Sequence, residues 1–195
     1  MTGNHESRRV LAAGDPHGEL LRAVRVCHPS WESVRRLTFV PDRSAPGWNS
    51  WLTGIFTPVL LPQLHAARLA LAAGDASALQ ACERALEAGL PAGARAASAS
   101  AGSALARDFT VPNAEKSWLK YRDLVLAEKT PGHLAVVLAL RSSAFHLAPA
   151  SLTAAYVLLE ARGGLPRQTP AVWMQMVDDC LLVKGTPVDA GLRAA

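Results

Sequence analysis

The sequence predicts an all-α protein, a compact single-domain bundle of about eight to ten helices. Three observations lead to this prediction. Hydrophobic residues make up 50% of the 195-residue chain and are largely Ala and Leu, which favour helices. Aromatic residues, which favour strands, make up only 6%. Glycine, proline and capping residues divide the chain into segments whose apolar side chains recur at helical spacing.

The first part of the chain carries the weakest helical signals. Residues 1–17 are polar and contain glycine and proline, so we expect a flexible N-terminal arm before an all-helical domain at 18–195. Short helices are expected over 19–28 and 31–40. The sequence PDRSAPG at 41–47 then predicts a loop.

Stronger signals follow. A helix that is interrupted near Pro58 is expected to continue over 63–73. Gly74 tolerates the left-handed conformation that ends a helix, and Asp75 can accept hydrogen bonds from the free amides that begin one. The sequence therefore predicts a tight turn from this helix into another over 76–88.

Residues 94–107, ARAASASAGSALAR, predict a helix made almost entirely of small residues. Glycine inside a helix costs about 0.5–1 kcal/mol relative to alanine, so Gly102 needs a compensating role. Close approach of neighbouring backbones is the natural one. The plainer interpretation is that alanine is simply the best helix former. The residues expected on the packed side are Ala97, Ala101, Ala104 and Leu105.

Two further helices are expected before residue 150. Asn113 is a suitable N-cap for a helix over 114–128. The segment GHLAVVLALRSSAFHL, residues 132–147, is apolar nearly all round and predicts a central, buried helix.

The last part of the chain repeats the capping pattern. Ser151 is expected to cap a helix over 152–161. Thr169 followed by Pro170 predicts the start of another helix over 171–184, because proline is favoured at the first helical position.

Composition argues against several classes of protein. The net charge of +4 is dispersed, without the dense basic patch that nucleic-acid binding requires. No uninterrupted apolar run approaches membrane-spanning length, and no secretory signal is visible, so we expect a cytoplasmic, non-membrane protein. The three cysteines are widely separated and are expected to be buried apolar residues, namely Cys27, Cys82 and Cys180.

No catalytic set, metal site or cofactor motif is apparent, so we expect no enzyme activity, no metal and no cofactor. The six histidines show neither the HxH nor the HExxH spacing of metal ligands. His133 lies at the start of the most buried predicted helix. Its ring is expected to bond a backbone group near the helix N-terminus, with a metal role as the less favoured alternative.

Three segments together resemble the UreF family of urease accessory proteins. Residues 60–109 are similar to that family's helix ending in a Gly-Asp turn, a second helix, and an Arg-x-x-Ser-x-x-x-Gly helix. Here that last motif is Arg95, Ser98 and Gly102.

The other two segments are shorter. Residues 132–147 resemble the family's central helix, with Gly132 and His133 at its start. Residues 181–192 are loosely similar to the closing Lys-Leu-x-Pro-x-Gly-Gln, with Lys184 at the lysine position. The family's N-terminal signature is missing, so the sequence resembles a divergent member of the family.

The resemblance implies a cytoplasmic, non-enzymatic, dimer-forming protein. It would bridge another accessory protein and a GTPase while nickel is delivered to urease. The residues implied as partner-binding or structural are Arg95, Ser98, Gly102, Gly132, His133 and Lys184.

Two other functions remain open from the residues alone. One is a helical small-molecule-binding or catalytic protein whose pocket is lined by Trp118, Tyr121, Trp173 and Met174, although such aromatic residues more often belong to a core. The other is a helix-turn-helix regulator around Arg35 and Arg36, which lacks a basic recognition helix.

Overall fold

The computed structural model describes residues 47, 50–110 and 114–164. This part of the chain is all-α, as predicted, and contains six α-helices and one π-helical segment without a strand. The elements are η2 (Leu52–Leu60), α4 (Leu61–Ala73), α5 (Ala76–Gly89), α6 (Ala92–Arg107), α7 (Lys116–Leu126), α8 (Leu134–Ala144) and α9 (Pro149–Gly164). The expected arm at 1–17 and the helices at 19–28, 31–40 and 171–184 lie outside the described residues. The same holds for residues 41–46 of the expected loop, for the expected cap Asn113, and for Cys27 and Cys180.

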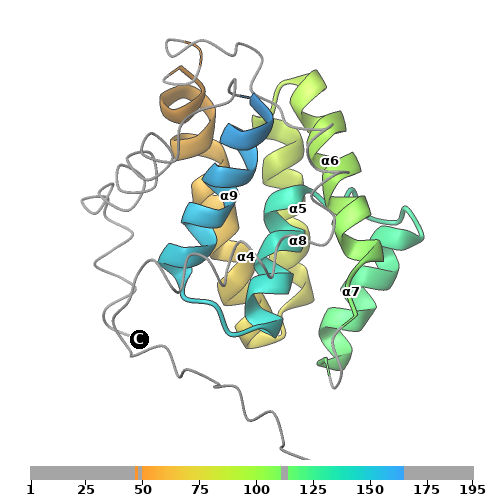
Figure 1. Ribbon diagram of the computed structural model, residues 1–195. Coiled ribbons are helices and arrows are strands. Elements are labelled where there is room, and N and C mark those ends of the chain that lie inside the picture. The colour runs from red at the N-terminus through yellow and green to blue at the C-terminus, as the bar shows by residue number, and fades with distance from the viewer. Residues whose placement is uncertain (1–46, 48–49, 111–113, 165–195) are drawn as a thin grey trace, which may run out of the picture.

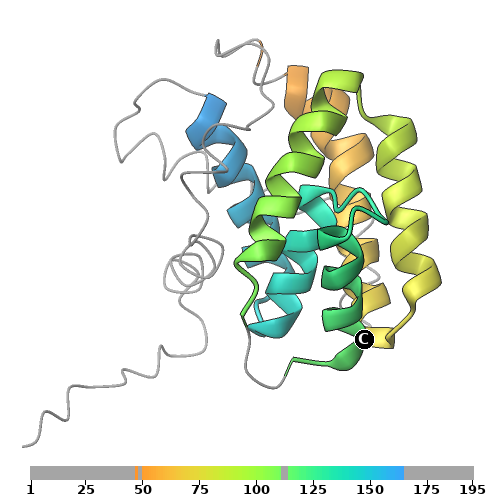
Figure 2. The same cartoon turned by 90° about the vertical axis from the view of Figure 1, so that its right-hand side faces the viewer.

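Helix α8 forms the centre of the bundle (Figures 1 and 2). It contacts α4, α5, α6 and α9, and every residue from Leu134 to Ser142 is buried. The predicted central helix is therefore confirmed, although it is shorter than 132–147. Helix α7 packs mainly on α6 and lies at the edge of the bundle (Figure 1).

Pro58 changes the type of helix without breaking it. The predicted interruption is a π-helical segment, η2, that runs directly into α4. Proline has no N–H to donate, and its ring clashes with the carbonyl four residues earlier in a regular α-helix. The wider π-helical turn offers a way to accommodate both effects.

The predicted turn between α4 and α5 is confirmed. Gly74 adopts a left-handed conformation with φ of 65°. The Asp75 carboxylate accepts hydrogen bonds from the backbone N–H groups of Ser77 and Ala78, at 2.9 and 3.0 Å. Both residues therefore play the roles that their types indicate.

Helix α7 is shorter at both ends than predicted, and its start at Ala114 was wrong. Glu115 has an extended ψ of 142°, and its carbonyl accepts from the amides of Trp118 and Leu119 at 3.0 and 3.1 Å. At the other end Glu128 adopts a left-handed conformation. The helix ends there at a residue other than glycine, so the sequence did not indicate this end.

The predicted cap of the last described helix was also wrong. Ser151 is buried inside α9, which begins two residues earlier at Pro149. Proline suits the first turn of a helix because it needs no N–H acceptor there. Leu152 already donates its N–H to the Ala148 carbonyl at 3.0 Å, so the helix is established before Ser151 could cap it.

Among the residues that the structure describes, one helical stretch, Leu52–Ala73, is long and apolar enough to cross a membrane by length and composition alone. His65 and Arg68 interrupt this stretch, so it contains no continuous apolar run of membrane-spanning length. Leu64 and Ala67 in this stretch are completely buried, and α4 shares an extensive interface with α8. A core helix passes the same test, so the stretch is weak evidence for a membrane span.

Candidate functional site

The backbone of the small-residue helix α6 lies directly against the backbone at the start of α8. A Cβ added to Gly102 would lie 1.9 Å from the Gly132 carbonyl oxygen and 2.9 Å from the Leu134 amide nitrogen. Gly132 itself adopts φ of 67°. The predicted close packing is therefore confirmed at Gly102. The most buried small residues of α6 are Ala94, Ser98, Ala101, Gly102 and Ala106, whereas Ala97 and Ala104 are half-buried.

Side chains from other helices cap the first turn of α8. The first N–H groups of a helix have no partner within it. Ser98 Oγ on α6 accepts a hydrogen bond from the Leu134 amide at 3.1 Å, and Glu83 Oε2 on α5 accepts from the His133 amide at 3.2 Å. These contacts hold α5 and α6 to the same end of α8.

Glu83 is a buried carboxyl group with a second bond, because the Tyr121 hydroxyl donates to Glu83 Oε1. Burial raises the pKa of Glu83 to about 7, against the opposing effect of these donors. Burial and the neighbouring carboxylate also raise the pKa of Tyr121. The carboxyl group thus joins α5, α7 and the start of α8.

The ring of His133 is completely buried and bonds Glu87. Its Nε2 lies 2.9 Å from Glu87 Oε1, while Nδ1 has no hydrogen-bond partner in the described part of the chain. The expected bond to a backbone group was therefore wrong, because a carboxylate is within reach of the ring. Burial lowers the pKa of His133, although Glu87 opposes the shift. A neutral ring that donates through Nε2 fits these contacts.

Arg95 completes this chain of contacts at the surface. Its Nη1 donates to the Glu87 carbonyl at 3.0 Å and lies 3.8 Å from Glu87 Oε2. Both side chains are roughly two-fifths exposed, at 41% and 43%, so the ion pair is screened by solvent.

The structure brings five of the six predicted site residues together where α5 and α6 meet the start of α8. These are Arg95, Ser98, Gly102, Gly132 and His133. Their contacts described here are internal to the chain, and a role in binding a partner stays a prediction. Lys184 lies outside the described residues.

Sequence reasoning missed two members of this site, Glu83 and Glu87, and placed a third, Tyr121, in an aromatic pocket without its bond to Glu83. The signal was present for Glu83, which lies four residues after Leu79 and three before Leu86 on the apolar stripe of α5. Glu87 follows Glu83 by four residues and therefore lies on the same side of the helix.

A hollow of about 510 Å³ lies between α5 and α7, beside this site. Trp118 and Tyr121, two of the four residues expected to line an aromatic pocket, line it. Glu83 and Glu87 also line it. The other two expected residues, Trp173 and Met174, lie outside the described residues. We call this feature the α5–α7 hollow.

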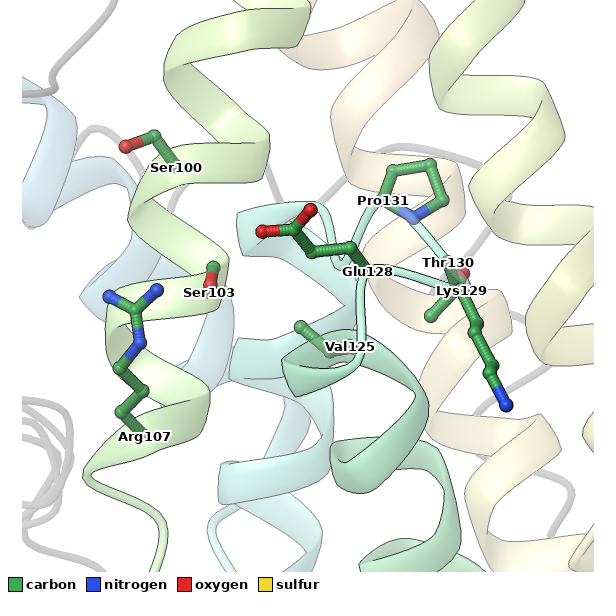
Figure 3. A pocket seen from close by; sticks show the side chains of 8 residues that line it. All are labelled: Ser100, Ser103, Arg107, Val125, Glu128, Lys129, Thr130 and Pro131. Carbon is green, nitrogen blue, oxygen red and sulfur yellow. The ribbon is translucent and has the colours of Figure 1, made fainter.

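A second hollow, of about 450 Å³, lies between α6 and the loop from α7 to α8 (Figure 3). Figure 3 shows Glu128 pointing toward α6, which supplies Ser103 and Arg107, and Lys129 pointing away from it. Lys129 also lines the α5–α7 hollow, so the loop presents opposite charges to its two sides.

The polar side chains of this site are suited to holding the backbone at the start of α8 in place. Within the described ranges, no group of three or more His, Cys, Asp or Glu side chains is placed to hold a metal ion. Cys82 is a buried free thiol, as expected. The polar side chains of the site bind amides, a hydroxyl and one another, and so fix three helices around the start of α8.

Comparison with known protein families identifies a relationship for this chain. The model of the UreF family matches residues 43–164, which is more than half of the chain. No curated protein and no solved structure matches the chain.

Proposed function

The chain belongs to the UreF family of urease accessory proteins, and from this premise we propose that it is a non-enzymatic adaptor. It assists assembly of the nickel metallocentre of urease through protein–protein contacts. Nickel is the cargo of this process, and the adaptor holds no cofactor of its own. The match over residues 43–164 is the observation that carries the proposal.

The proposed partners are the other urease accessory proteins, including a GTPase, and a second copy of the chain. The protein is proposed to work in the cytoplasm, without binding nucleic acid or a membrane. A rigid helical body supports such a role, because a partner can then bind a surface that needs little ordering. The site around α8 supplies that rigidity through buried bonds from three helices.

Size-exclusion chromatography with light scattering tests the proposal directly. The full chain is purified and measured alone, with the purified GTPase, and with the other accessory protein from the same urease system. The proposal expects a dimer alone and a complex of larger mass with at least one of the two proteins. A monomer that binds neither protein contradicts it.

A second candidate function is binding of a small molecule. Trp118 and Tyr121 line the α5–α7 hollow, whose 510 Å³ lies within the size range of ligand pockets. A ligand screen that raises the melting temperature of the full chain, and that loses the effect in Trp118→Ala, would favour this function. The Trp118→Ala variant must first show a helical circular dichroism spectrum, because Trp118 is buried.

A further inference from the structure

We propose that the α5–α7 hollow is a docking site for a protein partner, and that the docked segment carries large apolar side chains flanked by Asp or Glu. The inference rests on the proposed function, because it supplies the surface through which the adaptor would hold a partner. It goes further by stating where the partner binds and which chemistry it presents.

The wall of the hollow is suited to apolar anchors. Leu71 from α4, Leu79 from α5, and Trp118 and Leu124 from α7 line it. The Trp118 indole donates to the Leu71 carbonyl at 3.4 Å, which fixes the ring in place. Preformed pockets with rigid aromatic walls are where partner side chains contribute most binding energy.

Three exposed cations surround this apolar wall. Arg84 comes from α5, Lys120 from α7, and Lys129 from the loop that follows α7. Within residues 50–110 and 114–164, no ion pair involves any of the three. Figure 3 shows Lys129 pointing away from α6, and Glu128 turned toward it. The neighbouring acid therefore does not neutralise Lys129 on this side.

The two acids that line the hollow are already engaged. Glu83 is buried and bound to Tyr121, and Glu87 is bound to His133 and Arg95. Among the described residues, the exposed charged side chains without an ion-pair partner around the apolar wall of the hollow are consequently the three cations. Acidic residues flanking an apolar anchor complement this distribution, whereas a basic segment would be repelled.

The position of α7 leaves room for such a partner. This helix lies at the edge of the bundle and packs mainly on α6 (Figure 1). A neighbouring hollow of about 460 Å³ continues along α7 and shares Lys120, Leu124 and Lys129 with the first. A short helix or extended segment could therefore bind along the outer side of α7.

Site-specific cross-linking on the full chain tests the docking site. Benzoylphenylalanine replaces Leu124 in the hollow or, as a control, the exposed Thr57 on η2. Each labelled chain is irradiated with the purified GTPase, the other accessory protein or urease apoprotein, and the linked peptide is identified by mass spectrometry. The proposal expects a cross-link from position 124, and not from position 57, to an apolar segment flanked by acids.

Charge reversal gives the matching affinity measurement. The double variant Lys120→Glu and Lys129→Glu should weaken binding of the cross-linked partner about tenfold and reduce its salt dependence. Arg107→Glu is the control, because Arg107 is exposed on α6 and lines neither the α5–α7 hollow nor its continuation along α7. It should change the affinity less than about twofold. All three of these basic side chains are exposed, so the variants should fold.

The outcomes separate the two proposals. If the unmodified chain binds none of the three proteins, both the adaptor function and the docking site are overturned. If a partner binds and the double variant binds it equally well, only the docking site is overturned. A cross-link that joins position 124 to a basic segment, or to residues of the same chain beyond 164, also overturns it.

Discussion

Gly102 on α6 and Gly132 before α8 meet so closely that a Cβ on the first would lie 1.9 Å from the carbonyl oxygen of the second. No side chain separates the two backbones at this point. The small residues of α6 therefore have a structural role, because they allow the start of α8 to pack directly against this helix. Glycine at position 102 is required by this contact, despite its cost inside a helix.

Gly102→Ala should lower the free energy of unfolding by roughly 3 kcal/mol or prevent folding, because backbone has to move to admit the methyl group. Gly93→Ala, on the same helix, is the control. Nothing lies within 4 Å of a Cβ at Gly93, so alanine should be neutral or stabilise by up to about 1 kcal/mol. Urea denaturation followed by circular dichroism measures both, and equal stabilities would contradict the contact.

Ser98→Ala should cost about 1–2 kcal/mol, because the buried Leu134 amide loses its acceptor. Ser103→Ala, on the half-buried side of the same helix, should change stability by no more than about 0.5 kcal/mol. Slower amide exchange at Leu134 in the native chain than in Ser98→Ala would locate the effect at the start of α8. Unchanged exchange there would argue against the cap.

Glu83→Gln should remove a pH dependence of stability. The folded-state pKa of Glu83 is raised from 4.5 to about 7, so the folded chain holds this proton more tightly than the unfolded chain does. The resulting stabilisation is fully present below pH 4.5 and is lost as the pH rises to about 7. The native chain should therefore lose up to about 3 kcal/mol relative to Glu83→Gln across this window.

The comparison with Glu83→Gln is needed because His133 acts in the opposite direction. Burial lowers the pKa of His133, so its contribution to stability is lost as the pH falls. Taking the difference between the native chain and the variant cancels this effect. Denaturation at several pH values between 4 and 8 measures it, and a difference that does not vary with pH would refute the assignment.

The two contacts of the Glu87 side chain, with His133 and with Arg95, should contribute unequally to the free energy of unfolding. Glu87→Ala leaves the buried His133 Nε2 without its partner and should cost about 1–3 kcal/mol. Arg95→Ala breaks a half-exposed ion pair and a hydrogen bond to the Glu87 carbonyl, both near solvent, and should cost less than about 1 kcal/mol. A double-mutant cycle measured by denaturation checks this order. A larger loss from Arg95→Ala would show that the surface pair dominates.

The sequence predicted those features that depend on local chemistry. The Gly74–Asp75 turn follows from one residue's backbone freedom and the next residue's capping oxygen. The burial of α8 follows from its uniformly apolar surface. The special status of Gly102 follows from its cost inside a helix, which called for a compensating contact.

Features that depend on contacts distant in sequence could not be predicted in this way. The His133 ring meets Glu87 across 46 positions, and Glu83 meets Tyr121 across 38. The C-terminal end of α7 was misplaced because Glu128 adopts a left-handed conformation that its residue type seldom takes. The first two features are set by contacts between distant residues, whereas the end of α7 is closed by local backbone bonds from Glu128 and Lys129.

The most direct test of the adaptor function is activation of urease in a purified system. Urease apoprotein, nickel, GTP and the other accessory proteins are mixed with or without the full chain, and urea hydrolysis is followed over time. We predict that activation depends on the chain and is largely lost with Gly102→Ala but retained with Gly93→Ala. Equal activation in the absence of the chain would contradict the proposed function.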